Sequence, residues 1–496
     1  MMNKVPVIRQ IVQIAEENPD SIAIEGGVNL TYSHLIELIK KFSEEVQELS
    51  ATSFAIDLDN GPEWAVLDLA LLDAGKILTP LPAFFSDRQV RHLLTDAGVE
   101  LLFTTSPERF GKFGGTVSRS FDLCGIRIYQ VHFNDQSITF PAGTAKVTYT
   151  SGTTGEPKGV CISSSSMRQV ALSIAKRAQV TSTDRHFISL PLTTLLENIG
   201  GLYATLMTGA TAVIRPQHEI GLSGATGIEP TCFIQSMEDA QATTTILIPQ
   251  MLDVLVNGIE FGFGALDHMR FIAVGGAPLS SVLLERADRM TLPVYEGYGL
   301  SEAVSVVAVN GPGNRKTGSV GKPLSHVDLQ IADDGEVYVH GALFNGYLGE
   351  SHSQLTSDGY LATGDVGEID GDGFLTLLGR KKNMFITSFG RNVAPEWVER
   401  ELTIHPDILQ AAIFGESRPW NVAVIVVKPG ADIEEAMGQA NERLPDYAQI
   451  SRWITADIPF TVENGQWTGS ARPRREVIWG CYGERIEKLY TLAPTG

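Results

Sequence analysis

The sequence predicts an α/β protein with a large N-terminal domain of layered α/β subdomains plus a β unit, and a small α+β C-terminal domain. Apolar segments of strand length alternate with segments of helical periodicity, which is typical of buried parallel strands covered by helices. The length of 496 residues exceeds what one ordinary core supports, so two or more domains are expected. The last segments mix short strands and helices, which fits a domain of roughly 110 residues.

The first part of the chain shows the alternation clearly. A helical segment at 7–17 is followed by a strand at 21–25, and Ser33 is the expected N-cap of a helix that runs through Leu49. The pattern continues with a strand over 54–58, a helix over 63–74, and strands over 77–82 and 99–103 with another helix between them.

Glycine-rich turns follow several of the later strands. Strands over 271–274 and from Val294 run into Gly275-Gly276 and Gly297-Tyr298-Gly299, and ligands of open α/β sheets lie outside such carboxyl ends. The other expected elements are strands at 146–149 and 185–192, a helix over 164–179, a β unit over 318–324 and 335–341, a helix over 396–404, strands over 410–414 and 421–427, and a helix over 434–443.

Composition excludes several classes of function. The chain has 38 Lys+Arg against 58 Asp+Glu, a net charge of −20, and such a surface repels nucleic acid and anionic membranes. Its four cysteines are far apart and form no Cys-x-x-Cys pair, so reduced thiols are expected. The N-terminus lacks a signal-peptide core, and no run approaches the ~18 apolar residues of a membrane span. These observations predict a cytoplasmic protein.

Residues 150–159, Thr-Ser-Gly-Thr-Thr-Gly-Glu-Pro-Lys-Gly, have the composition of a loop that cradles phosphates. Glycines permit turns that a Cβ obstructs, and hydroxyls, backbone N–H groups and the Lys158 ammonium can face a polyphosphate. The loop is not a P-loop, because Glu156-Pro157 stand where that motif needs Lys and Ser/Thr. An isolated run of this kind is equally typical of a polar surface loop.

Together with Gly275-Gly276-Ala277, Tyr298-Gly-Leu-Ser-Glu302 and Thr363-Gly-Asp365, the loop resembles the motifs of the adenylate-forming (AMP-binding) enzyme superfamily. The resemblance extends from Leu30 to Arg475 and is greatest to acyl-CoA synthetases, the fatty-acid–CoA ligases. It implies nucleotide binding by Thr150, Ser151, Gly152, Thr153, Thr154, Gly155, Lys158, Gly276, Ala277, Tyr298, Gly299, Ser301, Asp365 and Arg380.

Several of the implied roles have a simple chemical basis. The phenol ring of Tyr298 suits stacking against adenine, and the Asp365 carboxylate can accept both ribose hydroxyls. Glu302 is the implied Mg²⁺ ligand, because Mg²⁺ is usually bound by a carboxylate together with substrate phosphates. The implied catalytic residues are Lys158, Thr154 and Glu302, with a cation from the C-terminal domain.

The resemblance also implies an acyl site and two domains that move. The acyl-binding residues are Leu195, Leu196, Gly275 and Gly297, although residues 193–201 are equally typical of a helix start buried in the core. The domains are expected to be 1–380 and 381–496, with a hinge near Lys382 and a mobile C-terminal domain. Gly390 is expected to line the tunnel for the thiol substrate.

The tail departs from the family pattern. Related enzymes carry a lysine there that contacts the carboxylate and the α-phosphate during adenylation, whereas this chain has Arg472 at that place. A guanidinium is also cationic and can bridge carboxylate and phosphate oxygens. The alternative is that Arg472 is a solvated member of a basic cluster with Arg474 and Arg475.

These residues predict an AMP-forming acid–thiol ligase that uses ATP, Mg²⁺ and CoA. An ionised carboxylate needs no general base to attack the α-phosphate, so positioning and charge neutralisation suffice. The expected substrate is an apolar, fatty carboxylic acid, and the expected partners are that acid, ATP and CoA. Two alternatives are an acyl-AMP ligase that delivers to an acyl carrier protein or another nucleophile, and an adenylate-binding protein without catalysis.

Overall fold

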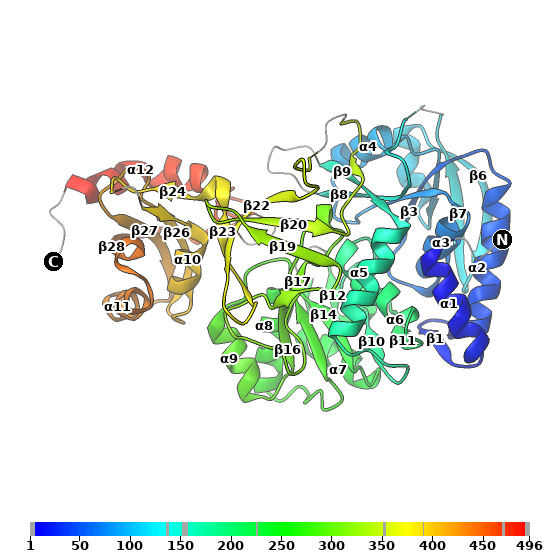
Figure 1. Ribbon diagram of the computed structural model, residues 1–496, viewed down its shortest axis with the longest axis horizontal. Coiled ribbons are helices and arrows are strands. Elements are labelled where there is room, and N and C mark those ends of the chain that lie inside the picture. The colour runs from blue at the N-terminus through cyan, green and yellow to red at the C-terminus, as the bar shows by residue number, and fades with distance from the viewer. Residues whose placement is uncertain are drawn as a thin grey trace.

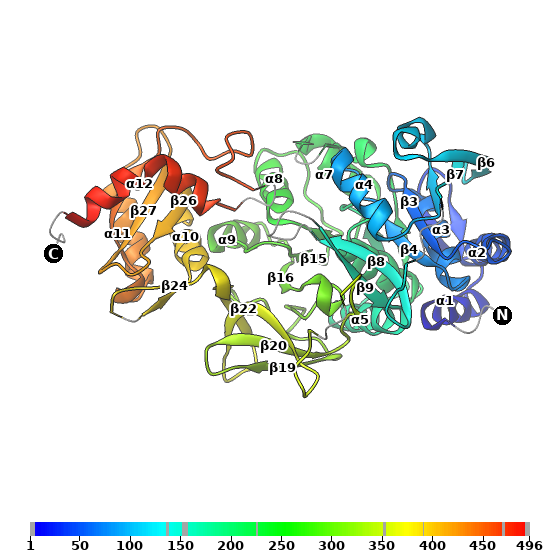
Figure 2. The same cartoon turned by 90° about the horizontal axis from the view of Figure 1, so that it is seen from above.

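Two large β-sheets form the body of the chain, and a smaller sheet lies at its C-terminal end (Figures 1 and 2). The structure is a computed structural model and describes residues 5–134, 138–150, 157–224, 227–350, 354–389, 391–468 and 472–491. In both views the elements from β24 to α12 form a separate C-terminal lobe, which follows β23 in the chain. In the described ranges, no helix has the length and apolarity to cross a membrane.

The first large sheet has the strand order β21-β9-β8-β4-β3-β5-β7-β6. Its centre is parallel, because β3 pairs with β4 and β5 and β4 pairs with β8, while the strands toward both edges pair antiparallel. The strands are β3 (Ser53–Asp57), β4 (Ile77–Pro80), β5 (Leu101–Thr104), β6 (Thr116–Leu123), β7 (Ile126–His132), β8 (Thr144–Thr150), β9 (Lys158–Ser163) and β21 (Gly346–Tyr347).

The second large sheet has the order β18-β17-β16-β15-β14-β10-β11-β1-β2 and is parallel from β16 to β1. The carboxyl ends of β14, β15 and β16 therefore lie at one edge. The strands are β1 (Ile22–Glu25), β2 (Leu30–Thr31), β10 (Arg185–Phe187), β11 (Thr211–Val213), β14 (Thr244–Leu247), β15 (Phe271–Val274), β16 (Val294–Tyr298), β17 (Ala308–Val309) and β18 (Lys322–Pro323).

Helices cover these sheets and build two large apolar clusters. One cluster joins the helices α1, α2, α3 and α5 with strands of both sheets. In the other cluster, α7, α8 and α9 pack on β14–β16. The helices are α1 (Pro6–Glu17), α2 (Tyr32–Gln47), α3 (Pro62–Asp73), α5 (Ser164–Arg177), α4 (Asp87–Asp96), α6 (Ala204–Leu206), α7 (Pro230–Asp239), α8 (Pro249–Glu260) and α9 (Ser281–Arg289). Shorter helical turns are η1 (Pro107–Phe113), the π-helical η2 (Leu196–Tyr203), η3 (Gln217–Ile220) and η4 (Ser301–Ala303).

An antiparallel sheet of order β19-β20-β22-β23 contains the strand expected over 335–341, whereas the strand within 318–324 is β18 of the second large sheet. In Figure 2 the antiparallel sheet lies along the lower side of the molecule. Its strands, with those of a small hairpin, are β19 (Val327–Ile331), β20 (Glu336–Gly341), β22 (Leu361–Ile369), β23 (Leu375–Arg380), β12 (Leu222–Ser223) and β13 (Gly227–Ile228).

The C-terminal lobe has its own core on both faces of the sheet β26-β27-β28. Alternate side chains of β26 and β27 pack on α10 and α11 on one face and on α12 on the other, as the period of two in a strand requires. The elements are η5 (Lys381–Asn383), β24 (Phe385–Ile386), β25 (Asn392–Val393), α10 (Pro395–Thr403), β26 (Ile408–Phe414), β27 (Asn421–Val427), α11 (Ile433–Arg443), η6 (Asp446–Ala448), β28 (Ile450–Thr455) and α12 (Arg475–Thr491).

Two further sequence expectations need correction, and one helix was not predicted. Thr31, not Ser33, caps α2, because its hydroxyl accepts from the His34 N–H at 3.2 Å. The strand expected over 185–192 ends at Phe187. The sequence analysis did not predict α12, which buries Ile478 and Ile486 within the C-terminal lobe. This helix begins at Arg475, the last residue of the basic cluster with Arg472 and Arg474.

Candidate functional site

The two strands that flank the predicted phosphate loop lie side by side. β8 and β9 pair antiparallel, with Thr150 opposite Lys158. The predicted loop residues Ser151, Gly152, Thr153, Thr154 and Gly155 lie outside the described residues. The pairing therefore brings the two ends of the segment together at the edge where Lys158 begins β9.

Tyr347 connects the predicted phosphate lysine with the predicted metal carboxylate. The Lys158 ammonium lies 4.9 Å from the centre of the Tyr347 ring and pairs with Glu350 at 2.7 Å. The Tyr347 hydroxyl donates to Glu302 Oε1 at 2.6 Å. Burial, together with the Glu302 hydrogen bond and charge, raises the pKa of the Tyr347 phenol, so this hydroxyl stays a donor. Tyr347 was not predicted from the sequence. The structure identifies it, because the pairing of β21 with β9 places Tyr347 opposite Val160.

Three predicted nucleotide-binding residues from different strands meet at one carboxylate. Tyr298 ends β16 and donates to Asp365 Oδ2 at 2.6 Å, and Arg380 Nε at the end of β23 lies 2.8 Å from Oδ1. Burial raises the pKa of Asp365, but the charge of Arg380 and the Tyr298 hydrogen bond oppose the rise. We call Tyr298, Asp365 and Arg380 the Asp365 cluster.

Two glycines of the site, Gly276 and Gly299, lie where a side chain is unfavourable, for different reasons. Gly276 has φ +84°, a left-handed conformation that favours glycine. A Cβ on Gly299 would lie 1.5 Å from the Ser305 carbonyl oxygen, so no other residue fits there without a shift of the backbone. Ala277 follows the Gly275-Gly276 pair, while Ser301 opens η4, the turn that carries Glu302.

Three of the four predicted acyl-binding residues converge at the carboxyl ends of the parallel strands. A Cβ placed on Gly275 would lie 3.5 Å from the Gly297 carbonyl oxygen and 3.9 Å from Leu196 Cδ2. Leu196 is partly buried and packs against both large apolar clusters. Leu195, the fourth residue, is only 8% exposed and belongs to the core.

Arg472 lies in the C-terminal lobe, directly before Pro473, which forms an antiparallel bridge with Trp467, and it is exposed. Its N–H donates to Thr468 Oγ1 at 3.0 Å, and the Thr468 N–H donates to its carbonyl at 2.8 Å. Its positive charge lowers the pKa of Asp365, where burial is the larger and opposing influence. It also lowers the pKa of Lys382, after burial and Arg380. Arg472 therefore stands within electrostatic reach of the Asp365 cluster.

The predicted hinge residue Lys382 lies in η5, between β23 and β24. Its neighbours are tied down on either side: Lys381 pairs with Asp334 and Glu336, each at 2.6 Å, and Asn383 donates to Glu396. Gly390, the predicted tunnel residue, lies outside the described residues.

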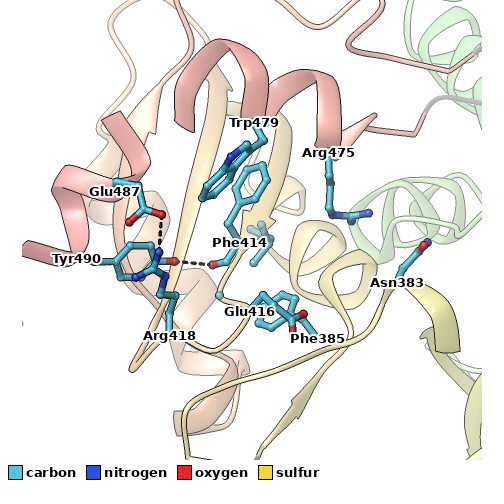
Figure 3. Close-up of a pocket in the computed structure, with 11 residues that line it drawn as sticks. Asn383, Phe385, Phe414, Glu416, Arg418, Arg475, Trp479, Glu487 and Tyr490 are labelled. Carbon is cyan, nitrogen blue, oxygen red and sulfur yellow. Dashed lines mark hydrogen bonds and ion pairs between the residues drawn. The ribbon is translucent and has the colours of Figure 1, made fainter. Parts of the chain in front are cut away.

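A cavity of about 420 Å³ lies in the C-terminal lobe, and Asn383 is one of the residues that line it (Figure 3). Its walls combine Phe385, Phe414, Trp479 and Tyr490 with an Arg418–Glu487 ion pair. No predicted site residue lines it. Among the residues that the structure describes, no three His, Cys, Asp or Glu side chains gather as a metal site.

Comparison with known proteins gives matches along nearly the whole chain. Residues 11–348 match the AMP-binding enzyme family, and residues 382–493 match the AMP-binding enzyme C-terminal domain. A long-chain-fatty-acid–CoA ligase of Mycobacterium tuberculosis is 27% identical, covering 92% of this chain and 89% of the relative. A 2-succinylbenzoate–CoA ligase of Bacillus licheniformis is 28% identical, covering 88% of this chain and 93% of the relative.

Solved structures show the same fold. The o-succinylbenzoate CoA synthetase of Bacillus subtilis, in complex with ATP and a magnesium ion, has a TM-score of 0.74 at 25% identity and covers 94% of this chain and 98% of its own. An anthranilate CoA ligase in complex with anthranoyl-AMP has a TM-score of 0.79 at 17% identity, with 96% of each chain covered.

Proposed function

The chain belongs to the AMP-binding enzyme family, and on that premise we propose that it converts an apolar, fatty carboxylic acid into its CoA thioester through an acyl-adenylate. The observation that carries the proposal is the convergence of the predicted nucleotide residues at Asp365, with Arg472 of the C-terminal lobe within electrostatic reach. The resemblance to adenylate-forming enzymes, the α/β fold class and the ligase class predicted from the sequence are confirmed, with ATP, magnesium and CoA as the cofactors of that class.

In the first half-reaction, a carboxylate oxygen of the acid attacks the α-phosphorus of ATP. A C(O)–O–P bond forms, the bond to the β-phosphate oxygen breaks, and pyrophosphate leaves with the electron pair. The nucleophile is already ionised, so the protein must align the reactants and offset negative charge rather than remove a proton. Glu302 would hold a bound Mg²⁺ ion, which would supply part of that charge compensation.

Asp365 has the acceptor capacity that ribose binding needs. An ionised carboxylate offers about four lone-pair sites, and Arg380 and Tyr298 occupy one on each oxygen. The remaining sites can accept both ribose hydroxyls. Lys158 then binds the β- and γ-phosphates. Tyr347 contacts Lys158 and donates a hydrogen bond to Glu302, so it keeps the carboxylate of the predicted metal ligand near this lysine.

Arg472 takes the role of the lysine found in related enzymes. It is exposed, it lies close enough to lower the pKa of Asp365, and its planar guanidinium can bridge the acid and the α-phosphate. The second half-reaction, thiol attack on the adenylate, then requires the C-terminal domain (381–496) to turn about Lys382. That turn brings the Gly390 segment to the thiol tunnel and carries Arg472 away.

The acyl side favours an apolar acid. Leu196 and the backbone of Gly275 and Gly297 present aliphatic and small groups, and Leu195 is buried in the apolar cluster against which Leu196 packs. Relatives named as long-chain-fatty-acid and as aryl ligases both align over most of the chain, so chain length must be measured.

ATP–pyrophosphate exchange with a panel of acids tests the proposal. Exchange should rise with aliphatic chain length, since each buried methylene contributes about 0.8 kcal/mol, until the pocket ends. Thioester formation should then require CoA. Preference for acetate or a charged amino acid would contradict the acyl assignment, and thioester formation only with a holo carrier protein would replace CoA as the acceptor.

A further inference from the structure

A buried lysine lies at the centre of a polar network that the proposed reaction does not use. The Lys146 ammonium donates to Asp68 Oδ1 at 2.7 Å, Asn198 Oδ1 at 2.5 Å and the Tyr203 hydroxyl at 3.2 Å. Asn198 and Tyr203 also donate to Asp68 Oδ2, at 3.0 and 2.8 Å. The Lys146 and Asp68 side chains are 2% and 0% exposed. We call these four residues the Lys146 network.

Stability alone gives a poor account of this network. Replacing a buried ion pair by well-packed apolar residues is often neutral or stabilising, because desolvation offsets the attraction between the charges. Burial lowers the pKa of Lys146, while the charge of Asp68 and their hydrogen bond oppose that effect. With all three ammonium protons directed at acceptors, the network specifies geometry at the contact point of the elements that carry it.

Those elements are α3, β8 and η2. Lys146 lies in β8, which runs on to Thr150 and the predicted phosphate loop. Asn198 and Tyr203 lie in η2, which begins at Leu196. The network therefore joins the strand before the phosphate loop to the segment that carries the predicted acyl-side leucine. A π-helix is rare and frequently occurs at functional sites.

A second set of buried contacts holds the same segment through Glu197. Its carboxylate accepts from the Leu190 N–H at 2.7 Å and lies 3.0 Å from His186 Nε2, with the side chain fully buried. Gly201 leaves room for it, because a Cβ there would lie 2.1 Å from Glu197 Oε1. Both residues that follow Leu196 are thus fixed by partners in other elements.

Leu196 itself stands between two glycines. Its Cδ2 lies 3.9 Å from a Cβ position on Gly275, and its Cδ1 lies 3.8 Å from one on Gly200. The two anchored neighbours hold the backbone of Leu196, and the two glycines leave room for its side chain beside Gly275.

We propose that the Lys146 network and Glu197 are positioning residues for acyl specificity: they hold η2 so that Leu196 forms a fixed wall of the acyl pocket, which sets the size of the acid accepted. The inference rests on the proposed function, because it concerns the acyl side of that site. None of these four network residues is expected to touch the substrate.

The test compares the acid preference of Asn198→Ala with that of the wild type. This substitution keeps the Lys146–Asp68 ion pair and the Tyr203 contacts, and it removes the Asn198 contacts that hold η2 next to Leu196. The preference for the acid one methylene longer than the wild-type optimum should rise by about fourfold, the gain from burying one methylene. The KM for ATP should change by less than twofold. A purely structural defect would lower exchange with all acids equally.

The second experiment adds Asn198→Ala to a Leu196→Ala variant. If the network acts through Leu196, adding Asn198→Ala to Leu196→Ala produces no further change in acid preference. Asn421→Ala is the matched control, because Asn421 is an equally buried amide, 1% exposed, that donates to Tyr447 and Gln449 carbonyls in the C-terminal lobe. Its acid preference should equal that of the wild type. Wild-type preference in Asn198→Ala, or an additive effect in the double variant, overturns the inference.

Tyr203→Phe covers the case in which Asn198→Ala does not fold, since it removes only a hydroxyl. It should shift the preference in the same direction by a smaller factor, and an unchanged preference contradicts the inference.

Binding of acyl-sulfamoyl-adenosine analogues of increasing chain length separates the proposed function from the inference about the Lys146 network. A wild type that binds them without pyrophosphate exchange contradicts the proposed function alone, and the variants' chain-length preference in binding still decides whether the network sets the wall.

Discussion

Two buried carboxylates in this chain, Asp365 and Glu399, each face an arginine, but their surroundings differ. Asp365 in β22 takes one partner on each oxygen, Arg380 and Tyr298. Glu399 in α10 has both oxygens 2.6 Å from Arg475 Nη2, and its Oε1 also accepts from the Ile413 N–H at 2.9 Å.

The difference lies in acceptor capacity rather than burial, since the two residues are 6% and 7% exposed. Three protein contacts nearly fill the lone-pair sites of Glu399, and they tie the first residue of α12 to α10 and β26. Asp365 keeps room for two more donors and feels the charge of Arg472 from the C-terminal lobe. We therefore regard Glu399–Arg475 as a closed structural pair and Asp365–Arg380 as an open, ligand-binding pair.

The closed pair should show the largest effect, and on stability. Arg475→Ala leaves Glu399 buried without its cation, so the C-terminal lobe should lose about 3 kcal/mol of unfolding free energy. Chemical denaturation followed by tryptophan fluorescence measures this loss. AMP affinity should stay unchanged, and an unaltered unfolding midpoint would show that the pair is not structural.

The open pair should affect binding instead. Asp365→Ala removes two charge-assisted hydrogen bonds to ribose, each worth ~1.5–3 kcal/mol, so AMP affinity should fall at least about 100-fold. Calorimetric titration with AMP measures this, with Asp365→Asn as the variant of equal size. Affinity within twofold of the wild type would remove Asp365 from the nucleotide site.

Arg472 sharpens the comparison because it belongs to the same basic run as Arg475. Arg472→Ala should cut pyrophosphate exchange at least ~10-fold, which corresponds to about 1.4 kcal/mol of transition-state stabilisation, while Arg472→Lys keeps part of the rate. Thioester formation from preformed acyl-adenylate should survive. Arg474→Ala is the control, and equal exchange in both alanine variants would leave Arg472 as surface charge.

The smallest effect concerns pH. Burial raises the pKa of Glu399 from 4.5 to about 7, against the charge of Arg475. The folded carboxyl then holds its proton more tightly than the unfolded chain, so its contribution to stability is full below about pH 4.5 and is lost as the pH rises toward 7. Glu399→Gln does not titrate, so its melting temperature should fall less than that of the wild type between about pH 5 and 8. Parallel melting curves would contradict the raised pKa.

Local sequence patterns determined most of the elements and the family. Strand and helix periodicity depends on residues a few positions apart, so helices such as α1, α3 and α10 and strands such as β3 and β27 were predictable within a few residues. The motifs at 150–159, 298–302 and 363–365 identified an adenylate-forming enzyme, because each motif is contiguous in the chain. The roles of the individual site residues, the boundary at residue 380 and the cytoplasmic location stay predictions.

Only the tertiary structure showed which distant residues meet. Tyr347 reaches Lys158 and Glu302 because β21 pairs with β9, a register that no local pattern encodes. Lys146 begins the strand expected over 146–149, and its burial depends on an aspartate 78 residues earlier and an asparagine 52 residues later. Long-range pairing of this kind is decided by how sheets and helices pack over the whole domain, whereas a sequence pattern reports only on neighbours within one element.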